Sequence, residues 1–139
     1  REVRDRRGAS LETVSLHPAV YQTDVTVEHF LQYVTPEGDL AGFLRLSLPK
    51  RSRNELPICE IRDAAMVREL HVYGPAQSLG ERGRGAQHHG LGTQLLEEAA
   101  SIARRAGHEA LAVIAAVGTR VYYRERGFTE GTLYPTQRL

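Results

Sequence analysis

The feature that most constrains this chain is a glycine-rich, basic segment, residues 77–92, that leads directly into an amphipathic helix. An apolar strand pattern over residues 64–73 precedes the segment, and a short apolar strand over residues 111–116 follows the helix. Strand, loop, helix and strand form a βαβ unit, whose two strands lie parallel. The apolar face of the helix is expected at Leu91, Leu95, Leu96, Ala99, Ile102 and Ala103.

The rest of the chain predicts antiparallel strands and one further helix. A turn at residues 35–39 separates two strand patterns and indicates a hairpin. Gly107 and Gly127 are the expected ends of the two helices. The remaining elements are expected as strands over residues 11–16, 25–34, 40–48 and 128–133 and as a helix over residues 118–126.

The composition is typical of one globular domain. The 139 residues are 41% hydrophobic and 25% charged, with a formal net charge of +1. The single cysteine, Cys59, excludes an internal disulfide framework and any site built from several cysteines. No apolar run approaches the roughly 18–20 residues of a membrane helix and no signal-peptide pattern opens the chain, so we expect a cytoplasmic location and no membrane partner.

The sequence QHHGLG at residues 87–92 can form an anion site. Backbone N–H groups of a glycine-rich turn converge at a helix N-terminus, and glycine lets a ligand approach without a Cβ in the way. Neither the Gly-Lys-Ser/Thr of a P-loop nor the GxGxxG order of a dinucleotide fingerprint is present. The residues alone therefore indicate either a phosphate cradle or a surface loop without a ligand. His88 and His89 are adjacent, which is awkward for two ligands of one ion, so no metal site is expected.

Three segments in order resemble a known family. QxxGxG at residues 87–92 resembles the acyl-CoA pyrophosphate loop of the GNAT superfamily of N-acetyltransferases. Together with RELHVYG at residues 68–74 and VGTRVYYRERGF at residues 117–128, it resembles the acetyltransferase domain of Elongator-type enzymes, which modify the wobble uridine of tRNA. The resemblance is clear over residues 60–128 and weaker over residues 11–48. It implies the GNAT acetyltransferase fold, an α/β fold with a mixed, mostly antiparallel sheet, a splayed parallel strand pair and flanking helices.

At matched positions the resemblance implies an acetyl-CoA site. The strand with Glu69, Leu70, His71 and Val72 would splay from its parallel partner and present main-chain groups to the pantetheine arm. Tyr122 and Tyr123 would lie near the thioester, with Tyr123 against the cofactor. The residues that would hold the pyrophosphate are Gln87, His89, Gly90, Leu91, Gly92 and Thr93.

Three side chains are candidates for catalysis, and each has a structural alternative. A phenol near the thioester sulfur can donate a proton to the leaving thiolate or orient it. Adjacent helical residues point about 100° apart, so only one of Tyr122 and Tyr123 can face the site well, and we favour Tyr123. The alternative is two half-buried rings that anchor the helix. Glu69 can act as a general base through water, or it can be a solvent-facing partner of Arg68; His71 is equally well explained as a strand histidine.

The resemblance also implies partners beyond this chain. In the family, a preceding radical-SAM domain, with an iron–sulfur cluster and S-adenosylmethionine, supplies radical chemistry, and the whole enzyme adds a carboxymethyl-type group to C5 of the uridine. One cysteine cannot hold such a cluster. We therefore expect residues 1–10 to be a linker remnant and residues 11–139 to be a GNAT-type acetyl-CoA-binding domain, a fragment of a longer radical-SAM enzyme. Apart from Lys50 the basic side chains are arginines, which suit tRNA as a partner but also fit genomic base composition.

These observations predict an acetyl-CoA-dependent acyltransferase domain of a tRNA wobble-uridine C5-modifying enzyme. It would activate or hydrolyse acetyl-CoA in response to tRNA, and it would be incomplete for the full reaction. Two alternatives stay open. One is a stand-alone GNAT N-acetyltransferase that acts on an amine or a lysine, and the other is a non-catalytic module that binds acetyl-CoA and tRNA.

Overall fold

The computed structural model describes residues 14–50, 64–73, 90–115, 119–130 and 134–139. Within these ranges the helices are α2 (Leu91–Arg105) and α3 (Arg120–Arg124). The strands are β1 (Ser15–Gln22), β2 (Thr26–Val34), β3 (Leu40–Pro49), β4 (Ala64–Val72), β5 (Ala110–Val113), β6 (Thr129–Glu130) and β7 (Pro135–Arg138).

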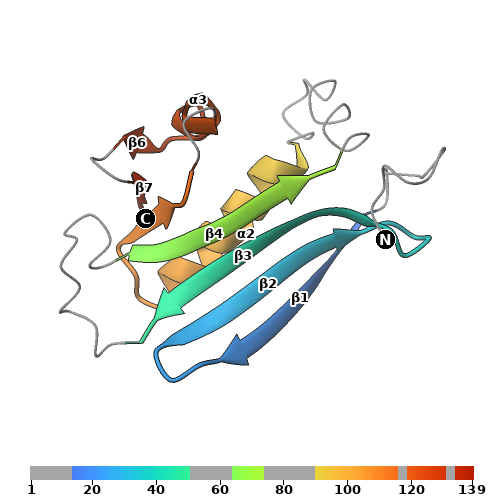
Figure 1. Ribbon diagram of the computed structural model, residues 1–139, viewed down its shortest axis with the longest axis horizontal. Helices are drawn as coiled ribbons and strands as arrows, with labels where there is room; N and C mark the ends of the chain where they lie inside the picture. Colours follow the sequence, from blue (N-terminus) through green and yellow to red (C-terminus); the bar gives the residue numbers. More distant parts are fainter. Residues whose placement is uncertain (1–13, 51–63, 74–89, 116–118, 131–133) are drawn as a thin grey trace.

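The strands of the described residues form one seven-stranded sheet in the order β1-β2-β3-β4-β5-β7-β6 (Figure 1). Strands β4 and β5 are parallel, and every other neighbouring pair is antiparallel. Strands β4 and β5 are the two strands of the predicted βαβ unit, because α2 lies between them in the chain. The predicted mixed, mostly antiparallel sheet with one parallel pair is confirmed.

Helix α2 covers one face of the sheet and supplies much of the core. Leu95, Ala99 and Ala103 are completely buried, and the helix packs against β3, β4 and β5. Leu44 and Val67 are among the sheet residues buried beneath it. The predicted apolar face is confirmed, although Ile102 is only partly buried. After the helix, Gly107 has a φ of +90°, a left-handed conformation that suits glycine at the end of a helix.

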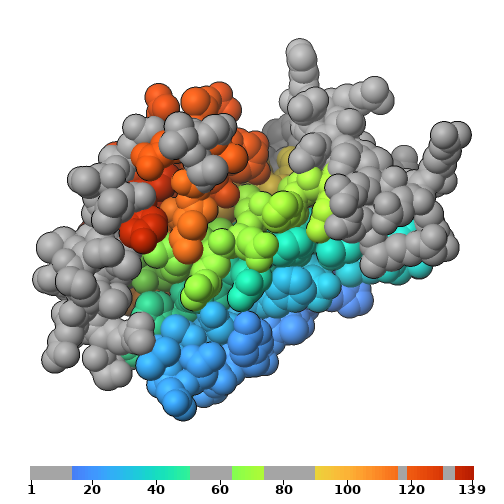
Figure 2. Space-filling model, viewed as in Figure 1, coloured from blue at the N-terminus to red at the C-terminus, as the bar shows by residue number. Residues whose placement is uncertain are grey.

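The other face of the sheet carries no helix among the described residues. Strands β1 to β4 lie side by side on the face that Figure 2 turns to the viewer, while α2 lies behind them. Phe43, Arg45, Glu69 and His71 belong to this face, because their neighbours Leu44 and Leu70 pack into the core.

The predicted first strand was misplaced. It was expected over residues 11–16, but β1 runs from Ser15 to Gln22, and residues 11–13 lie outside the described ranges. Strand β1 contains Pro18 and is largely exposed, so its sequence does not display a buried face. Because β1 is an edge strand that pairs only with β2, proline is tolerated there.

The end of the chain also differs from the prediction. Of the strand expected over residues 128–133, the described part contains the short β6, and residues 131–133 lie outside the described ranges; β7 was not predicted. Strand β7 pairs antiparallel with β5, with Ala110 opposite Arg138 and Ala112 opposite Thr136. Its sequence, Pro-Thr-Gln-Arg, has no apolar alternation, so its strand conformation depends on pairing with the buried β5. Among the described residues, no helix is long and apolar enough to cross a membrane.

Candidate functional site

The parallel strand pair separates at the end near Gly92, in the first turn of α2. Pairing between β4 and β5 runs from Ala64 and Ala110 to Val67 and Val113, and the backbone N–H of Ile114 donates to Val67 O at 3.0 Å. Beyond this point β4 continues to Val72 and pairs only with β3 among the described residues. A bulge at Arg68 shifts the β3 register just there, since Arg45 faces Glu69 while Leu46 faces Val67. The β4 segment that was expected to splay, Glu69 to Val72, is therefore not paired with β5 within the described ranges.

The N-terminus of α2 presents backbone donors. The first helical hydrogen bond runs from Gln94 N to Gly90 O at 3.1 Å, so the N–H groups of Gly90, Leu91, Gly92 and Thr93 have no intrahelical acceptor. No side chain of the described residues caps this end. Such donors, together with the positive end of the helix dipole, favour an anion. Gly90, Leu91, Gly92 and Thr93 thus occupy the place that the sequence predicted for them.

Tyr122 lies directly against the first turn of α2. A Cβ added at Gly92 would overlap the Tyr122 hydroxyl and would lie 3.5 Å from Cγ2 of Val72. Gly92, Tyr122 and Val72 therefore meet at one point, where the helix start, α3 and the end of β4 come together. Burial raises the pKa of the Tyr122 phenol, and the nearby Arg126 guanidinium partly opposes that rise. At neutral pH the phenol is a proton donor.

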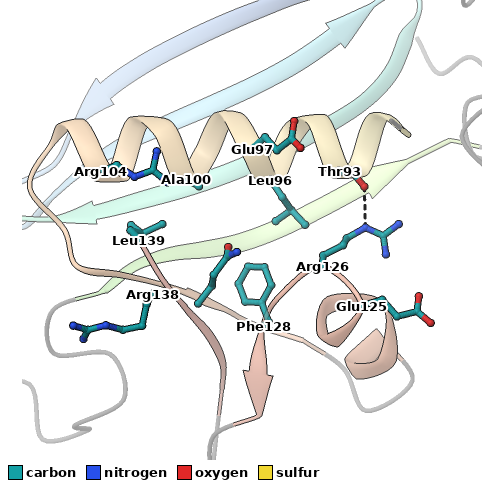
Figure 3. Close-up of a pocket in the computed structure, with 11 residues that line it drawn as sticks. Thr93, Leu96, Glu97, Ala100, Arg104, Glu125, Arg126, Phe128, Arg138 and Leu139 are labelled. Atoms are coloured by element: carbon teal, nitrogen blue, oxygen red, sulfur yellow. Dashed lines mark hydrogen bonds between the residues drawn. The ribbon is translucent and has the colours of Figure 1, made fainter. Parts of the chain in front are cut away.

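Arg126 connects the two helices at this junction. Its Nε donates to Thr93 Oγ1 at 3.0 Å (Figure 3), and its Nη1 donates to the Tyr122 carbonyl oxygen at 2.9 Å. Its guanidinium carbon lies 3.5 Å from the centre of the Tyr122 ring, a cation–π contact. The sequence analysis assigned Arg126 no role. The spacing of four residues from Tyr122 on one helix was the signal that could have indicated the contact.

Tyr123 is buried in the core. It is 6% exposed, and its ring packs edge-on against Phe128 and against Tyr122. Burial, and to a smaller extent Tyr122, raises the pKa of Tyr123 to about 12, against the effect of Arg126. The tyrosine that contacts Gly92 is thus Tyr122, while Tyr123, the favoured one of the pair, anchors α3 to the core.

Glu69 and His71 lie on the opposite face of β4 from Leu70 and Val72. Glu69 accepts a hydrogen bond from Arg45 at 3.2 Å, so its ion-pair partner is the cross-strand Arg45 rather than Arg68. Both side chains of the pair are 43% exposed, and such an ion pair contributes at most about 1 kcal/mol. His71 stacks on Phe43 with ring centres 5.4 Å apart. The structure therefore does not bring Glu69 and Tyr122 together on one face.

Several predicted features lie outside the described residues. These are Gln87, His88 and His89 of the loop, Cys59, and the arginines of residues 1–13, 51–63 and 74–89. Among the residues that the structure does describe, no group of three His, Cys, Asp or Glu side chains could hold a metal ion.

An open groove of about 770 Å³ extends from Thr93 and Arg126 along α2. Figure 3 shows it between α2 on one side and α3 and β7 on the other, with Arg104 and Arg138 at the end away from Thr93. Glu97 and Glu125 also line it. Thr93 and Arg126 thus border open space and are accessible to a ligand.

Comparisons with known proteins relate the chain to a group of acetyltransferases. No protein-family model matches it. The chain is 41% identical over 130 residues to tRNA uridine(34) acetyltransferase of Dehalococcoides mccartyi, and this match covers 90% of the chain and 28% of the relative. It is 46% identical over 106 residues to Elongator complex protein 3 of Danio rerio, covering 73% of the chain and 19% of the relative. The chain therefore spans less than a third of the length of these relatives.

Solved structures show the same fold. The Elongator complex protein 3 homologue of Methanocaldococcus infernus matches with a TM-score of 0.71 and 29% identity, over 94% of this chain and 31% of that one. A GNAT-family acetyltransferase from Staphylococcus aureus matches with a TM-score of 0.55 and 10% identity, over 81% of this chain and 68% of that one. The predicted GNAT fold and the resemblance to Elongator-type acetyltransferase domains are both confirmed.

Proposed function

Because this chain has the GNAT fold and is a relative of tRNA uridine(34) acetyltransferase and Elongator complex protein 3, we propose that it is the acetyl-CoA-binding domain of a tRNA wobble-uridine C5-modifying enzyme. In this proposal the domain hydrolyses acetyl-CoA in response to tRNA. The tRNA part of the proposal comes from the names of the relatives. The acetyl-CoA part rests on the junction at which the start of α2, the part of β4 beyond its pairing with β5, and the Tyr122 phenol meet.

The residues present fit acetyl-CoA as a ligand. The N–H groups of Gly90, Leu91, Gly92 and Thr93 would bind the pyrophosphate, together with Gln87 and His89 of the preceding loop. The main chain of β4 beyond Val67, which includes Glu69, Leu70, His71 and Val72, is not paired with β5 and would contact the amides of the pantetheine arm. When bound, acetyl-CoA supplies an acetyl group whose transfer to water yields acetate and the free thiol of coenzyme A.

The side chains at the junction would then donate and accept the protons of the reaction. Tyr122 holds its proton at neutral pH, because burial raises its pKa, and its hydroxyl at Gly92 is placed to protonate a leaving thiolate. Tyr123 would support this role from the core, although it stays a candidate donor itself. Glu69, on the other face of β4, would accept a proton through water from the acceptor side.

Calorimetric titration with acetyl-CoA tests the ligand. We expect one molecule bound per chain and loss of binding in Gly92→Leu, since the added side chain has to displace Tyr122. Ala106→Leu is the matched control, because it adds the same side chain at the exposed opposite end of α2. Circular dichroism of both variants reports whether they fold. Equal affinity in wild type and a folded Gly92→Leu would refute the cradle.

Thiol release tests the reaction. The proposal predicts that tRNA increases the release of coenzyme A thiol from acetyl-CoA and that acetate accumulates in equal amount. Release that depends on an added amine or lysine peptide, and not on tRNA, would identify an ordinary N-acetyltransferase instead. Binding of acetyl-CoA without any release, under both conditions, would identify a non-catalytic module.

A further inference from the structure

Arg126 makes three contacts that meet at the start of α2. Its Nε–H donates to Thr93 Oγ1, its Nη1 donates to the Tyr122 carbonyl, and its guanidinium lies over the Tyr122 ring. Arg126 is partly buried and borders the groove. One side chain thus links the first turn of α2 to the residue whose hydroxyl contacts Gly92.

The bond to Thr93 determines what that hydroxyl can do. An arginine has no acceptor, so the Thr93 oxygen has to be the acceptor in this pair. One lone pair of the oxygen is then occupied, and the hydroxyl hydrogen remains available for another group. A hydroxyl that accepts from a cation is also a stronger donor, because hydrogen bonds in a chain polarise one another. Thr93 is therefore set as a donor beside the backbone N–H groups of the helix start.

The contacts with Tyr122 fix the second group. The carbonyl bond and the cation–π contact hold the Tyr122 ring from its backbone and from its face, and its hydroxyl lies at Gly92. An ordinary link between two helices would need neither the ring contact nor a bond to a hydroxyl that borders open space.

We propose that Arg126 is a positioning residue of this site, which sets the Thr93 hydroxyl as a donor to the diphosphate of acetyl-CoA and holds Tyr122 at Gly92. The proposal rests on the proposed acetyl-CoA site and deepens it. It assigns Arg126 an effect on the diphosphate part of the ligand, acting through Thr93, and an effect on the thioester end, acting through Tyr122.

A comparison of two ligands isolates the effect of Arg126 on the diphosphate part. Acetyl-pantetheine has the thioester and the pantetheine arm of acetyl-CoA but no diphosphate. We expect Arg126→Gln to weaken acetyl-CoA binding by about tenfold or more, the size of a lost charge-assisted hydrogen bond, and acetyl-pantetheine binding by less than about twofold. Arg124→Gln is the matched control, because it removes the same charge from an exposed position two residues earlier, at the end of α3.

Two further variants test the mechanism. Thr93→Val should weaken acetyl-CoA binding, and adding Arg126→Gln to it should change the affinity little more, since both remove one interaction. Arg126→Lys keeps the charge, but a single ammonium cannot contact Thr93, the carbonyl and the ring together, so we expect only partial recovery. Thermal unfolding of each variant shows whether it is folded.

The outcomes separate this inference from the proposed function. If the wild-type chain does not bind acetyl-CoA, the proposed function fails and this inference fails with it. If the wild type binds but folded Arg126→Gln binds both ligands as tightly, only the inference is overturned. Equal losses for acetyl-CoA and acetyl-pantetheine, or additive effects with Thr93→Val, overturn the action of Arg126 on the diphosphate through Thr93.

Discussion

Gly92 and Tyr122 are so close that a substitution at one changes the effect of a substitution at the other on the unfolding free energy. Gly92→Ala places a methyl group on the Tyr122 hydroxyl, and we expect a loss of about 1–3 kcal/mol in unfolding free energy. Tyr122→Phe removes that oxygen and leaves the ring carbon 3.3 Å from the added Cβ. In this background Gly92→Ala should cost much less, because alanine also has the better helix propensity by up to about 1 kcal/mol. Urea unfolding of the four proteins measures the coupling, and additive effects would contradict the contact.

Tyr123 makes stability depend on pH in the alkaline range. Its pKa is about 12 in the folded protein and about 10 in an unfolded chain, so the folded state binds the proton more tightly. Its contribution is complete below about pH 10 and is lost as the pH rises toward 12. Between about pH 9 and 11 we expect a loss of about 1 kcal/mol that is absent in Tyr123→Phe. Urea unfolding at these pH values tests this prediction. The same dependence of the unfolding free energy on pH in wild type and Tyr123→Phe would contradict it.

The positions of some site residues could be predicted from the sequence, and those of others could not. The start of α2 was predicted from its glycines, and the 100° argument expected only one tyrosine of the pair to face the site; in the structure Tyr122 contacts Gly92 and Tyr123 is buried. Which of the two faces it depends on how α3 sits on the core, and local spacing does not contain that information. The Glu69–Arg45 pair also depends on strand register, because Arg45 is far from Glu69 in the chain and becomes its neighbour only through the antiparallel pairing of β3 and β4.

At the level of elements, α2 is held to the sheet by a narrow apolar stripe. Leu95 is completely buried in that stripe, and Glu97, two residues on, is exposed. Leu95→Ala should lower the unfolding free energy by about 2–5 kcal/mol, because it leaves a cavity between helix and sheet. Glu97→Ala should change it by less than about 0.5 kcal/mol. Denaturant unfolding of both variants tests the packing, and equal effects would show that α2 is not anchored there.

Elements with strong periodicity were predicted well, and elements that depend on a neighbour were not. Strands β2, β3 and β4 and helix α2 lie within a few residues of their predicted bounds, because each has a buried face that its sequence displays. Strand β1 is an exposed edge, and β7 is a polar segment that follows the buried β5. Their conformation comes from the pairing partner, which sequence patterns do not reveal.

At the level of the whole molecule, the part of β4 beyond its pairing with β5 separates two kinds of surface. The α2 side holds the helix start, Tyr122 and Arg126, and the other side holds Glu69, His71 and Phe43, with no helix over them among the described residues. A thioester at this part of β4 would be reached by the proton donor from one side and by an acceptor from the other. In the proposed reaction the acceptor would therefore approach from the side of Glu69 and His71.

The cysteine content limits what the isolated chain can do with tRNA. The chain has one cysteine, and an iron–sulfur cluster for radical chemistry needs several cysteine thiolates. We therefore expect the chain, supplied with acetyl-CoA, S-adenosylmethionine, a reductant and tRNA, to form acetate and free thiol but no C5-modified uridine. Mass spectrometry of the digested tRNA measures the product, and the full-length Dehalococcoides mccartyi relative is the positive control. Modified uridine formed by the isolated chain would show that the carbon–carbon bond at C5 is made without a cluster.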